Sequence, residues 1–352
     1  MDMTRFADAT PDYHEVSYDV RDWVARITLN REKAYNAYST QALVELAHAF
    51  RRASFDDRVA VIVYTGAGNR AFCTGGDVKE YAANYTSRPR DYWKYMVLFG
   101  GYLESILNTG KPVVARLNGM AVGGGNESQL ACDLSVMAEH ATIKQVGTSV
   151  GSVAAGGATQ WLPIFVGDRR ARYMLMTNRP VPAYQALEWG LVNQVVPSVK
   201  KGGAFVERAS PEQIELAQRD KDGYSIDLGR LDEAVQALCT ELIEKFPECM
   251  RYTKQQVNFW KDLAWHQTIG HARDWLSIHY ASWEPLEGMG AFVEKRPVDF
   301  MKLRRLAAEG RSSEFRWGPY QQHCPHCGAE DLPAGFAFCG QCGRPVTEGN
   351  PT

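Results

Sequence analysis

The sequence lacks several patterns that define whole classes of protein. None of its 352 residues lies in an apolar run of about 18, so no membrane-spanning helix is expected. Its 39 basic and 41 acidic side chains give a net charge of −2, without the basic excess that nucleic-acid binding usually needs. Residues 1–11 lack the basic-then-apolar order of a signal peptide. We therefore expect a cytoplasmic protein whose partners are neither membranes nor nucleic acids.

The chain does contain ample apolar material for a core. Hydrophobic residues make up 45% of it, and its length allows about two domains. Its eight cysteines fall into two groups. Cys73, Cys132, Cys239 and Cys249 are scattered, and in a reducing compartment they are most simply small buried side chains. The other four lie within the last 30 residues and need a different explanation.

Hydrophobic periodicity predicts an α/β fold. Two short apolar runs within residues 16–29, on either side of a turn, predict a β-hairpin. Ser39 or Thr40 is the expected N-cap of an amphipathic helix. The continuous apolar runs 59–65 and 111–117 predict fully buried strands. Buried strands that alternate with helices are typical of a parallel sheet.

Two glycine-rich loops, residues 71–77 (AFCTGGD) and 118–127 (NGMAVGGGNE), each follow an expected strand and lead into an expected helix. Glycine lets a ligand approach the backbone, and amides at a helix N-terminus donate to negative charge. The loops could each direct one N–H to the same oxygen and form an oxyanion hole. Two ordinary strand-to-helix turns are the simpler alternative. A dinucleotide site is disfavoured, because neither loop carries a full G-x-G-x-x-G and a Walker lysine is absent.

Five segments, in the right order, resemble the motifs of the crotonase (enoyl-CoA hydratase/isomerase) superfamily. Both glycine-rich loops belong to them: residues 71–79 match A-F-x-x-G-x-D-[IVL]-K, and residues 118–127 match N-G-x-A-x-G-G-G-x-E. Three other segments resemble further motifs of the family, namely residues 30–37 (NREKAYNA), 186–193 (ALEWGLVN) and 292–296 (FVEKR). The resemblance covers about residues 14–310.

The resemblance implies a spiral of ββα turns, followed by a helical region that assembles homotrimers or hexamers. It also implies an acyl-CoA thioester as the substrate, no redox cofactor, and an enolate stabilised by two backbone amides. By position in the motifs, these amides belong to Thr74 and Gly124. The family's CoA-binding positions are occupied here by Lys33, Ala34, Lys79, Phe292 and Lys295.

The catalytic positions follow the family only in part. Hydratases of the family use two glutamates, and Glu127 matches the first. The second falls at Gly147, so an ordinary two-glutamate hydration is not expected. Asp77 is the candidate for a second catalytic acid or base, and the alternative is that it caps a helix. For Glu127, the alternative to catalysis is a purely structural role as a buried carboxylate. Glu284 or Glu287 is another source of a replacement carboxylate.

Glycine at position 147 also resembles the naphthoate synthase branch, but that branch has an aspartate where this chain has Ala154. A third branch resembles the chain more closely, namely hydrolases that open alicyclic β-oxoacyl-CoA rings, such as the 6-oxocyclohex-1-ene-1-carbonyl-CoA hydrolases. Residues 13–17, 71–76 and 156–159 carry this likeness.

The resemblance to this branch implies an enzyme that adds water to a cyclic oxo-enoyl-CoA and cleaves the ring C–C bond, as in anaerobic-type aromatic degradation. Two alternatives stay open. One is an enoyl-CoA hydratase or isomerase for another acyl-CoA, and the other is a non-catalytic binding subunit of the same fold.

Cys324, Cys327, Cys339 and Cys342 form two C-x-x-C pairs, each followed by glycine, with eleven residues between the pairs. Four thiolates at this spacing predict a closed tetrahedral Zn²⁺ site in a small ribbon. The metal is expected to be structural, because four sulfur ligands leave no open coordination position. A redox role for the cysteines is the alternative. The zinc ribbon is also a candidate contact for a partner protein.

The composition divides the chain into four expected parts. Residues 1–229 are the expected spiral core, with a polar insertion near residues 198–229. Residues 230–310 are the expected helical trimerisation region, residues 311–322 a linker, and residues 323–346 the zinc ribbon.

Overall fold

The computed structural model describes residues 12–346; residues 1–11, on which the predicted lack of a signal peptide rests, lie outside the described part. The strands are β1 (Val16–Arg21), β2 (Val24–Leu29), β3 (Val61–Gly66), β4 (Ala71–Cys73), β5 (Val113–Leu117), β6 (Met120–Val122), β7 (Leu134–Ala138), β8 (Thr142–Lys144), β9 (Val181–Pro182), β10 (Gln194–Val196), β11 (Val199–Lys201), β12 (Ala204–Phe205), β13 (Tyr224–Ile226), β14 (Tyr320–Gln322) and β15 (Leu332–Pro333).

The helices are α1 (Thr40–Phe55), α2 (Val78–Glu80), α3 (Pro89–Leu107), α4 (Gly124–Ala131), α5 (Ala158–Val166), α6 (Asp168–Thr177), α7 (Ala183–Glu188), α8 (Pro211–Gln218), α9 (Gly229–Ile243), α10 (Pro247–Val257), α11 (Phe259–His279), α12 (Trp283–Glu294) and α13 (Lys302–Ala308). In the described part of the chain, no helix is both long and apolar enough to cross a membrane.

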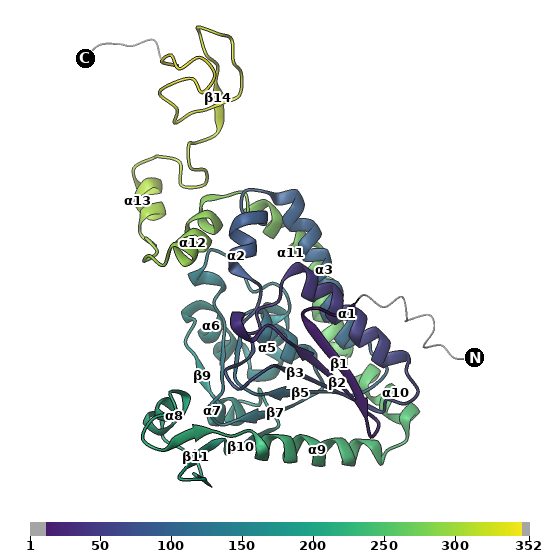
Figure 1. Cartoon of the computed structure of the whole chain (residues 1–352). Helices are drawn as coiled ribbons and strands as arrows, with labels where there is room; N and C mark the ends of the chain where they lie inside the picture. Colours follow the sequence, from purple (N-terminus) through teal and green to yellow (C-terminus); the bar gives the residue numbers. More distant parts are fainter. Residues whose placement is uncertain (1–11, 347–352) are drawn as a thin grey trace.

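Two sheets form the centre of the molecule (Figure 1). The larger sheet has the order β1-β2-β3-β5-β7-β10, in which β1 is antiparallel to β2 and the other neighbours are parallel. The smaller sheet has the order β4-β6-β8-β9, in which only β9 is antiparallel to its neighbour. The chain passes from one sheet to the other and then into a helix, as in β5, β6 and α4. This ββα spiral confirms the predicted fold class.

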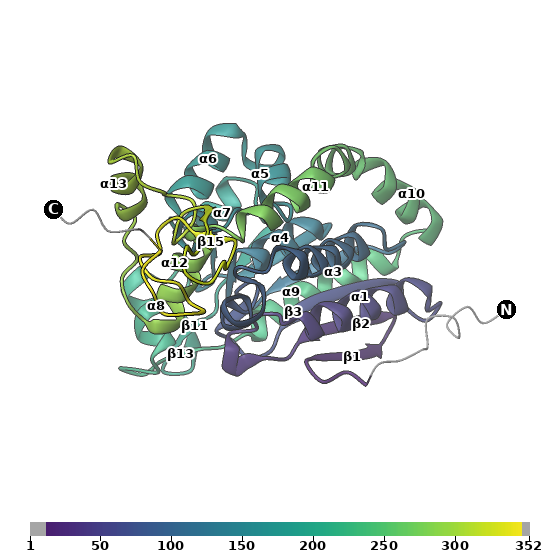
Figure 2. The same ribbon diagram turned by 90° about the horizontal axis from the view of Figure 1, so that it is seen from above.

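The central strands are apolar throughout because both faces of the larger sheet are covered. Val61 of β3 packs on one face with Leu231 of α9. Tyr64 of the same strand points to the other face, where its ring meets Phe50 of α1 edge-on, with 5.4 Å between the ring centroids. Helices α1 and α3 lie side by side over that second face (Figure 2). The predicted buried strand is therefore confirmed, although it begins at Val61.

The predicted N-terminal hairpin and first helix are also found. Val16 of β1 lies opposite Leu29 of β2 in an antiparallel register. Ser39 caps α1, because its Oγ accepts a hydrogen bond from the backbone N–H of Ala42 at 3.1 Å. These two elements place residues 30–38 beside the end of the smaller sheet, where the backbone N–H of Tyr38 donates to the carbonyl of Gly75 at 2.9 Å.

The C-terminal third adds three structural parts to the spiral. Residues 198–229 contain β11, β12, β13 and α8, and residues of β11, β13 and α8 share a small apolar core. Helices α9 to α13 follow, and α11 packs on α3 around the fully buried Trp265. The four clustered cysteines lie in a small unit that projects beyond α12 and α13 (Figure 1). β14 pairs with β15 in this unit, although Tyr320–Gln322 falls in the segment that was expected to be a linker.

Candidate active site

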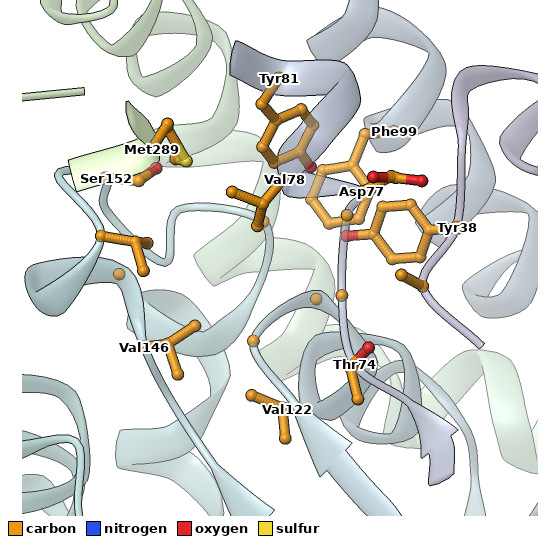
Figure 3. Close-up of a pocket in the computed structure, with 18 of the residues that line it drawn as sticks. Tyr38, Thr74, Asp77, Val78, Tyr81, Phe99, Val122, Val146, Ser152 and Met289 are labelled. Atoms are coloured by element: carbon orange, nitrogen blue, oxygen red, sulfur yellow. The ribbon is translucent and has the colours of Figure 1, made fainter. Parts of the chain in front are cut away.

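Six segments that are distant in the sequence enclose a cavity of about 740 Å³. The lining residues come from segments 31–38, 74–81, 92–99, 120–127, 145–156 and 276–292. Most of the lining side chains are apolar or aromatic, and a few polar groups point among them (Figure 3). A cavity of this size and character is typical of a site for a small organic ligand.

The two glycine-rich loops touch each other at this cavity. A Cβ atom on Gly75 would lie 3.0 Å from the amide nitrogen of Gly124, and a Cβ atom on Gly125 would lie 1.9 Å from the carbonyl oxygen of Cys73. Side chains at these positions would therefore force the loops apart. Thr74 and Gly124 both line the cavity, and Gly124 begins α4, where helix N–H groups have no partner within the helix. The predicted oxyanion hole needs this close approach of the two backbones.

Glu127 lies in the first turn of α4, and only 4% of its surface is exposed. The backbone N–H of Ala158 donates to its Oε1 at 3.2 Å. Burial raises the pKa of Glu127 to about 7, while hydrogen bonds from the backbone of Ala158 and Gly156 act in the opposite direction. A carboxyl group with a pKa near neutrality can both accept and release a proton at physiological pH, which suits general acid–base catalysis.

Asp77 also lines the cavity, but both of its carboxylate oxygens are engaged. Its Oδ1 accepts hydrogen bonds from the backbone N–H groups of Lys79 and Glu80, at 3.1 and 3.4 Å, and so caps α2. Its Oδ2 forms an ion pair with the guanidinium of Arg31 at 3.0 Å. The helix-cap interpretation describes this geometry, and a catalytic role for Asp77 stays a prediction.

The position expected to carry a second glutamate, Gly147, lines the cavity without a carboxylate. The replacements considered from the sequence, Glu284 and Glu287, are not among the lining residues and contact basic side chains outside the cavity. Among residues 12–346, the carboxylates that line the cavity are those of Asp77 and Glu127. With Asp77 bound by Arg31 and by the helix amides, Glu127 is the carboxylate that is left to act on a ligand.

The predicted CoA-binding residues divide into two groups. Lys33, Ala34, Lys79 and Phe292 all line the cavity, and 56% of the Phe292 surface is exposed. Lys295 follows the last turn of α12 with a φ of 55° and is not among the lining residues. The roles of all five residues in CoA binding stay predictions.

The sequence analysis missed a group of tyrosines that forms one wall of the cavity. Its members are Tyr38, Tyr81, Tyr92, Tyr95 and Tyr280. The rings of Tyr92 and Tyr280 stack with 3.5 Å between their centroids, and the Tyr280 hydroxyl donates to the Oγ of Ser152 at 3.2 Å. A signal was present for part of this wall, because Tyr92, Tyr95 and Phe99 recur at helical spacing and therefore share one face of α3.

The four clustered cysteines bring their sulfur atoms within 4.8 Å of one another. The Sγ atoms of Cys324 and Cys342 are 3.6 Å apart, and those of Cys327 and Cys339 are 3.7 Å apart. A tetrahedral zinc site with Zn–S bonds of about 2.3 Å needs sulfurs about 3.8 Å apart. The cluster is therefore suited to hold a metal ion of this kind.

Comparison with known proteins identifies the class to which this fold and cavity belong. Residues 19–214, more than half of the chain, match the enoyl-CoA hydratase/isomerase family. The chain belongs to this family, the crotonase family, and the predicted class of enzyme is confirmed.

Within the family, the chain is similar to proteins named 6-oxocyclohex-1-ene-1-carbonyl-CoA hydrolase. It is 37% identical to the one from Geobacter metallireducens, over 88% of this chain and 87% of that protein. It is 36% identical to the one from Thauera aromatica, over 81% of this chain and 82% of that protein.

Solved structures of the family superpose on most of the chain. A crystal structure of an enoyl-CoA hydratase from Bacillus anthracis is 29% identical, has a TM-score of 0.58, and covers 81% of this chain and 98% of its own. An enoyl-CoA hydratase from Mycobacterium avium subsp. paratuberculosis is 23% identical, has a TM-score of 0.66, and covers 82% of this chain and 98% of its own. The second likeness supports the fold alone.

Replacing Glu127 with Gln should change how the free energy of unfolding depends on pH. The pKa of Glu127 is raised from 4.5 to about 7 in the folded chain, so its contribution to stability is full below pH 4.5 and is lost as the pH rises through 7. Glutamine has no such ionisation. We expect the stability of Glu127→Gln relative to the wild type to be about 2 kcal/mol greater at pH 8.5 than at pH 5.5.

Urea denaturation at the two pH values measures this difference. Glu233→Gln, on an exposed face of α9, is the matched control for the loss of one carboxylate. A Glu127→Gln protein whose stability relative to the wild type is the same at both pH values would contradict the burial argument.

Proposed function

We propose that the chain is an acyl-CoA hydrolase that adds water to a cyclic oxo-enoyl-CoA and then cleaves the ring C–C bond. The observation that carries the proposal is a cavity with Glu127 buried beside the two glycine-rich loops and no carboxylate at Gly147. A two-glutamate hydratase needs a carboxylate at that second position. Relatives of 36–37% identity are named for hydrolysis of 6-oxocyclohex-1-ene-1-carbonyl-CoA, which supports the same class of substrate.

The first step of the proposed reaction is hydration of the ring alkene. Glu127 takes a proton from a water molecule while the water oxygen bonds to the ring carbon β to the thioester. The alkene electron pair moves to the thioester oxygen, which accepts hydrogen bonds from the amides of Thr74 and Gly124. Glu127 then returns the proton to the α carbon, and a pKa of about 7 suits it to both transfers.

The second step is hydrolysis of the ring. A second water attacks the ring keto carbon, and Glu127 accepts its proton. The bond between the keto carbon and the α carbon breaks, and its electron pair again becomes an enolate held at the thioester oxygen by Thr74 and Gly124. Protonation of the α carbon leaves an open-chain hydroxydicarboxyl-CoA, in which the former keto carbon is a carboxyl group.

Product analysis by mass spectrometry tests the proposal. Incubating the full chain with 6-oxocyclohex-1-ene-1-carbonyl-CoA should give a product heavier by two waters. Glu127→Gln should lower the rate by about 100-fold or more, because a positioned acid–base group contributes at least that much. Asp77→Asn is the informative comparison, since Asp77 is engaged by Arg31 and the amides of α2.

The alternatives give different products. A gain of one water alone on the cyclic substrate, or turnover of crotonyl-CoA alone, would make the chain a hydratase and contradict ring cleavage. Binding of both thioesters without any reaction would make it a non-catalytic binding subunit.

We also propose that the chain assembles as a homotrimer or hexamer through residues 230–310. Large apolar side chains are exposed along this region, and 64% of Trp260, 68% of Val257 and 71% of Ile278 are accessible in the single chain. Apolar surface of this kind is typical of a protein–protein contact. The cytoplasmic location and a partner protein for the ribbon stay predictions from the sequence.

We further propose that Cys324, Cys327, Cys339 and Cys342 hold one structural Zn²⁺. Elemental analysis of the purified full chain should find about one zinc per chain, because four thiolates in this arrangement form a closed site. Replacing Cys339 and Cys342 by Ser should remove the zinc and make residues 320–346 sensitive to protease. Cys249→Ser, which changes an exposed cysteine outside the cluster, is the control. Zinc retained in the double variant, or none in the wild type, would contradict the assignment.

A further inference from the structure

Two tyrosine hydroxyls stand directly over the two glycine-rich loops. A Cβ atom on Gly124 would lie 1.7 Å from the hydroxyl oxygen of Tyr38, and a Cβ atom on Gly76 would lie 1.6 Å from the hydroxyl oxygen of Tyr81. The hydroxyls therefore occupy the space where side chains would be if these positions were not glycine. Figure 3 shows both phenol rings with their hydroxyl ends directed into the cavity. Each loop thus carries a hydroxyl group beside its backbone.

The two hydroxyls differ in their hydrogen bonds. The hydroxyl of Tyr81 is bound to that of Tyr95 at 2.5 Å. The hydroxyl of Tyr38 has no hydrogen-bond partner among residues 12–346, although only 2% of the residue is exposed. Tyr38 lines the cavity, and its hydroxyl is not among the buried polar atoms that lack a partner, so the hydroxyl is accessible from the cavity. A ligand that offers an oxygen acceptor there can form a hydrogen bond with it. Tyr38 is therefore placed to bind a polar atom of the ligand.

The surroundings hold Tyr38 in place. Its ring stacks on Phe99 with 5.5 Å between the centroids and 22° between the planes, and Phe99 in turn stacks on Tyr95. Phe99 also faces Gly156, which lies against the carboxylate of Glu127. The hydroxyl of Tyr38 and the carboxylate of Glu127 consequently belong to the same packed part of the cavity.

Both phenols stay protonated at neutral pH. Burial raises the pKa of Tyr38 and of Tyr81 well above the ordinary value, and the charge of Glu127 acts in the same direction on both. Each hydroxyl is therefore a hydrogen-bond donor and not a base. A neutral donor beside a carboxylate can bind a carbonyl oxygen while the carboxylate accepts a proton from water.

We propose that Tyr38, supported by the neighbouring Tyr81–Tyr95 pair, donates a hydrogen bond to the ring keto oxygen of the substrate and thereby selects cyclic acyl-CoA thioesters that carry this oxygen. The inference rests on the proposed function, because it names how the same cavity recognises its substrate. When water attacks the keto carbon, the C=O electron pair moves onto the oxygen that Tyr38 binds, and the proton of the water passes to Glu127. No proton leaves Tyr38.

Two thioesters that differ only in the ring oxo group test this directly. Binding of 6-oxocyclohex-1-ene-1-carbonyl-CoA and of cyclohex-1-ene-1-carbonyl-CoA is measured by calorimetry on the full chain carrying Glu127→Gln, so that turnover during the measurement is strongly slowed. We expect the oxo compound to bind about tenfold more tightly, the size of one neutral hydrogen bond. Adding Tyr38→Phe should remove this preference and leave the affinity for the other thioester unchanged.

The Tyr38→Phe variant should fold, because the hydroxyl that it loses bonds to no described residue. Tyr64→Phe is the matched control, since Tyr64 is a fully buried tyrosine whose hydroxyl accepts a bond from Tyr102 and does not line the cavity. It should keep the preference for the oxo compound.

A preference that survives Tyr38→Phe, or that is absent before the change, would overturn the inference. So would an equal loss of affinity for both thioesters. Wild-type turnover of the oxo compound separates the two proposals. If the wild type cleaves it and Tyr38→Phe keeps the preference, only this inference fails. If the wild type binds it without converting it, the proposed function fails regardless of Tyr38. If the protein binds neither thioester, both proposals fail.

Discussion

The burial of one carboxylate is the constraint on which the rest of the site depends. Glu127 lies in the first turn of α4, where the backbone N–H of Ala158 can donate to it. At this position it lies among aromatic rings, and only 4% of its surface is exposed. Removal from water raises its pKa to about 7, which turns an ordinary acid into a group that exchanges protons near neutrality. The same burial requires Gly156 nearby, because a Cβ there would meet both Phe99 and Glu127.

The two glycine-rich loops follow from the spiral. Each ββα turn ends a short strand of the smaller sheet at the start of a helix, so the loops after β4 and β6 come to lie side by side. Glycine at positions 75 and 125 allows the two backbones to touch, and their amides can then converge on one oxygen. In the proposed reaction, backbone donors stabilise the enolate, one carboxylate transfers the protons, and Tyr38 donates a neutral hydrogen bond. A reaction with these roles requires no second glutamate.

Much of the fold could be predicted from the sequence because its signals are local. The hairpin and the buried strands follow from periodicity, and the two loops follow from motifs. The residue type predicts a cap at Ser39 or Thr40, and the structure shows Ser39 in this role. The tyrosine wall could not be predicted in the same way, because its residues meet only in the folded chain. They come from the segment before α1, from the π-helix Tyr81–Tyr85, from α3, and from the residue that follows α11. The engagement of Asp77 by Arg31 has the same origin, since 46 residues separate the two side chains. The four cysteines, whose spacing is local, were recognisable at once.

The central claim is that a single buried carboxylate performs the proton transfers. The most direct test of this claim is the pH dependence of kcat/KM for 6-oxocyclohex-1-ene-1-carbonyl-CoA. We expect one ionisation: activity rises with pH as Glu127 loses its proton, with an apparent pKa near 7, and then stays level, because burial raises the pKa of Tyr38 and of Tyr81 and both keep their protons. A bell-shaped profile with a second ionisation between pH 5 and 9, or activity independent of pH across 7, would contradict it.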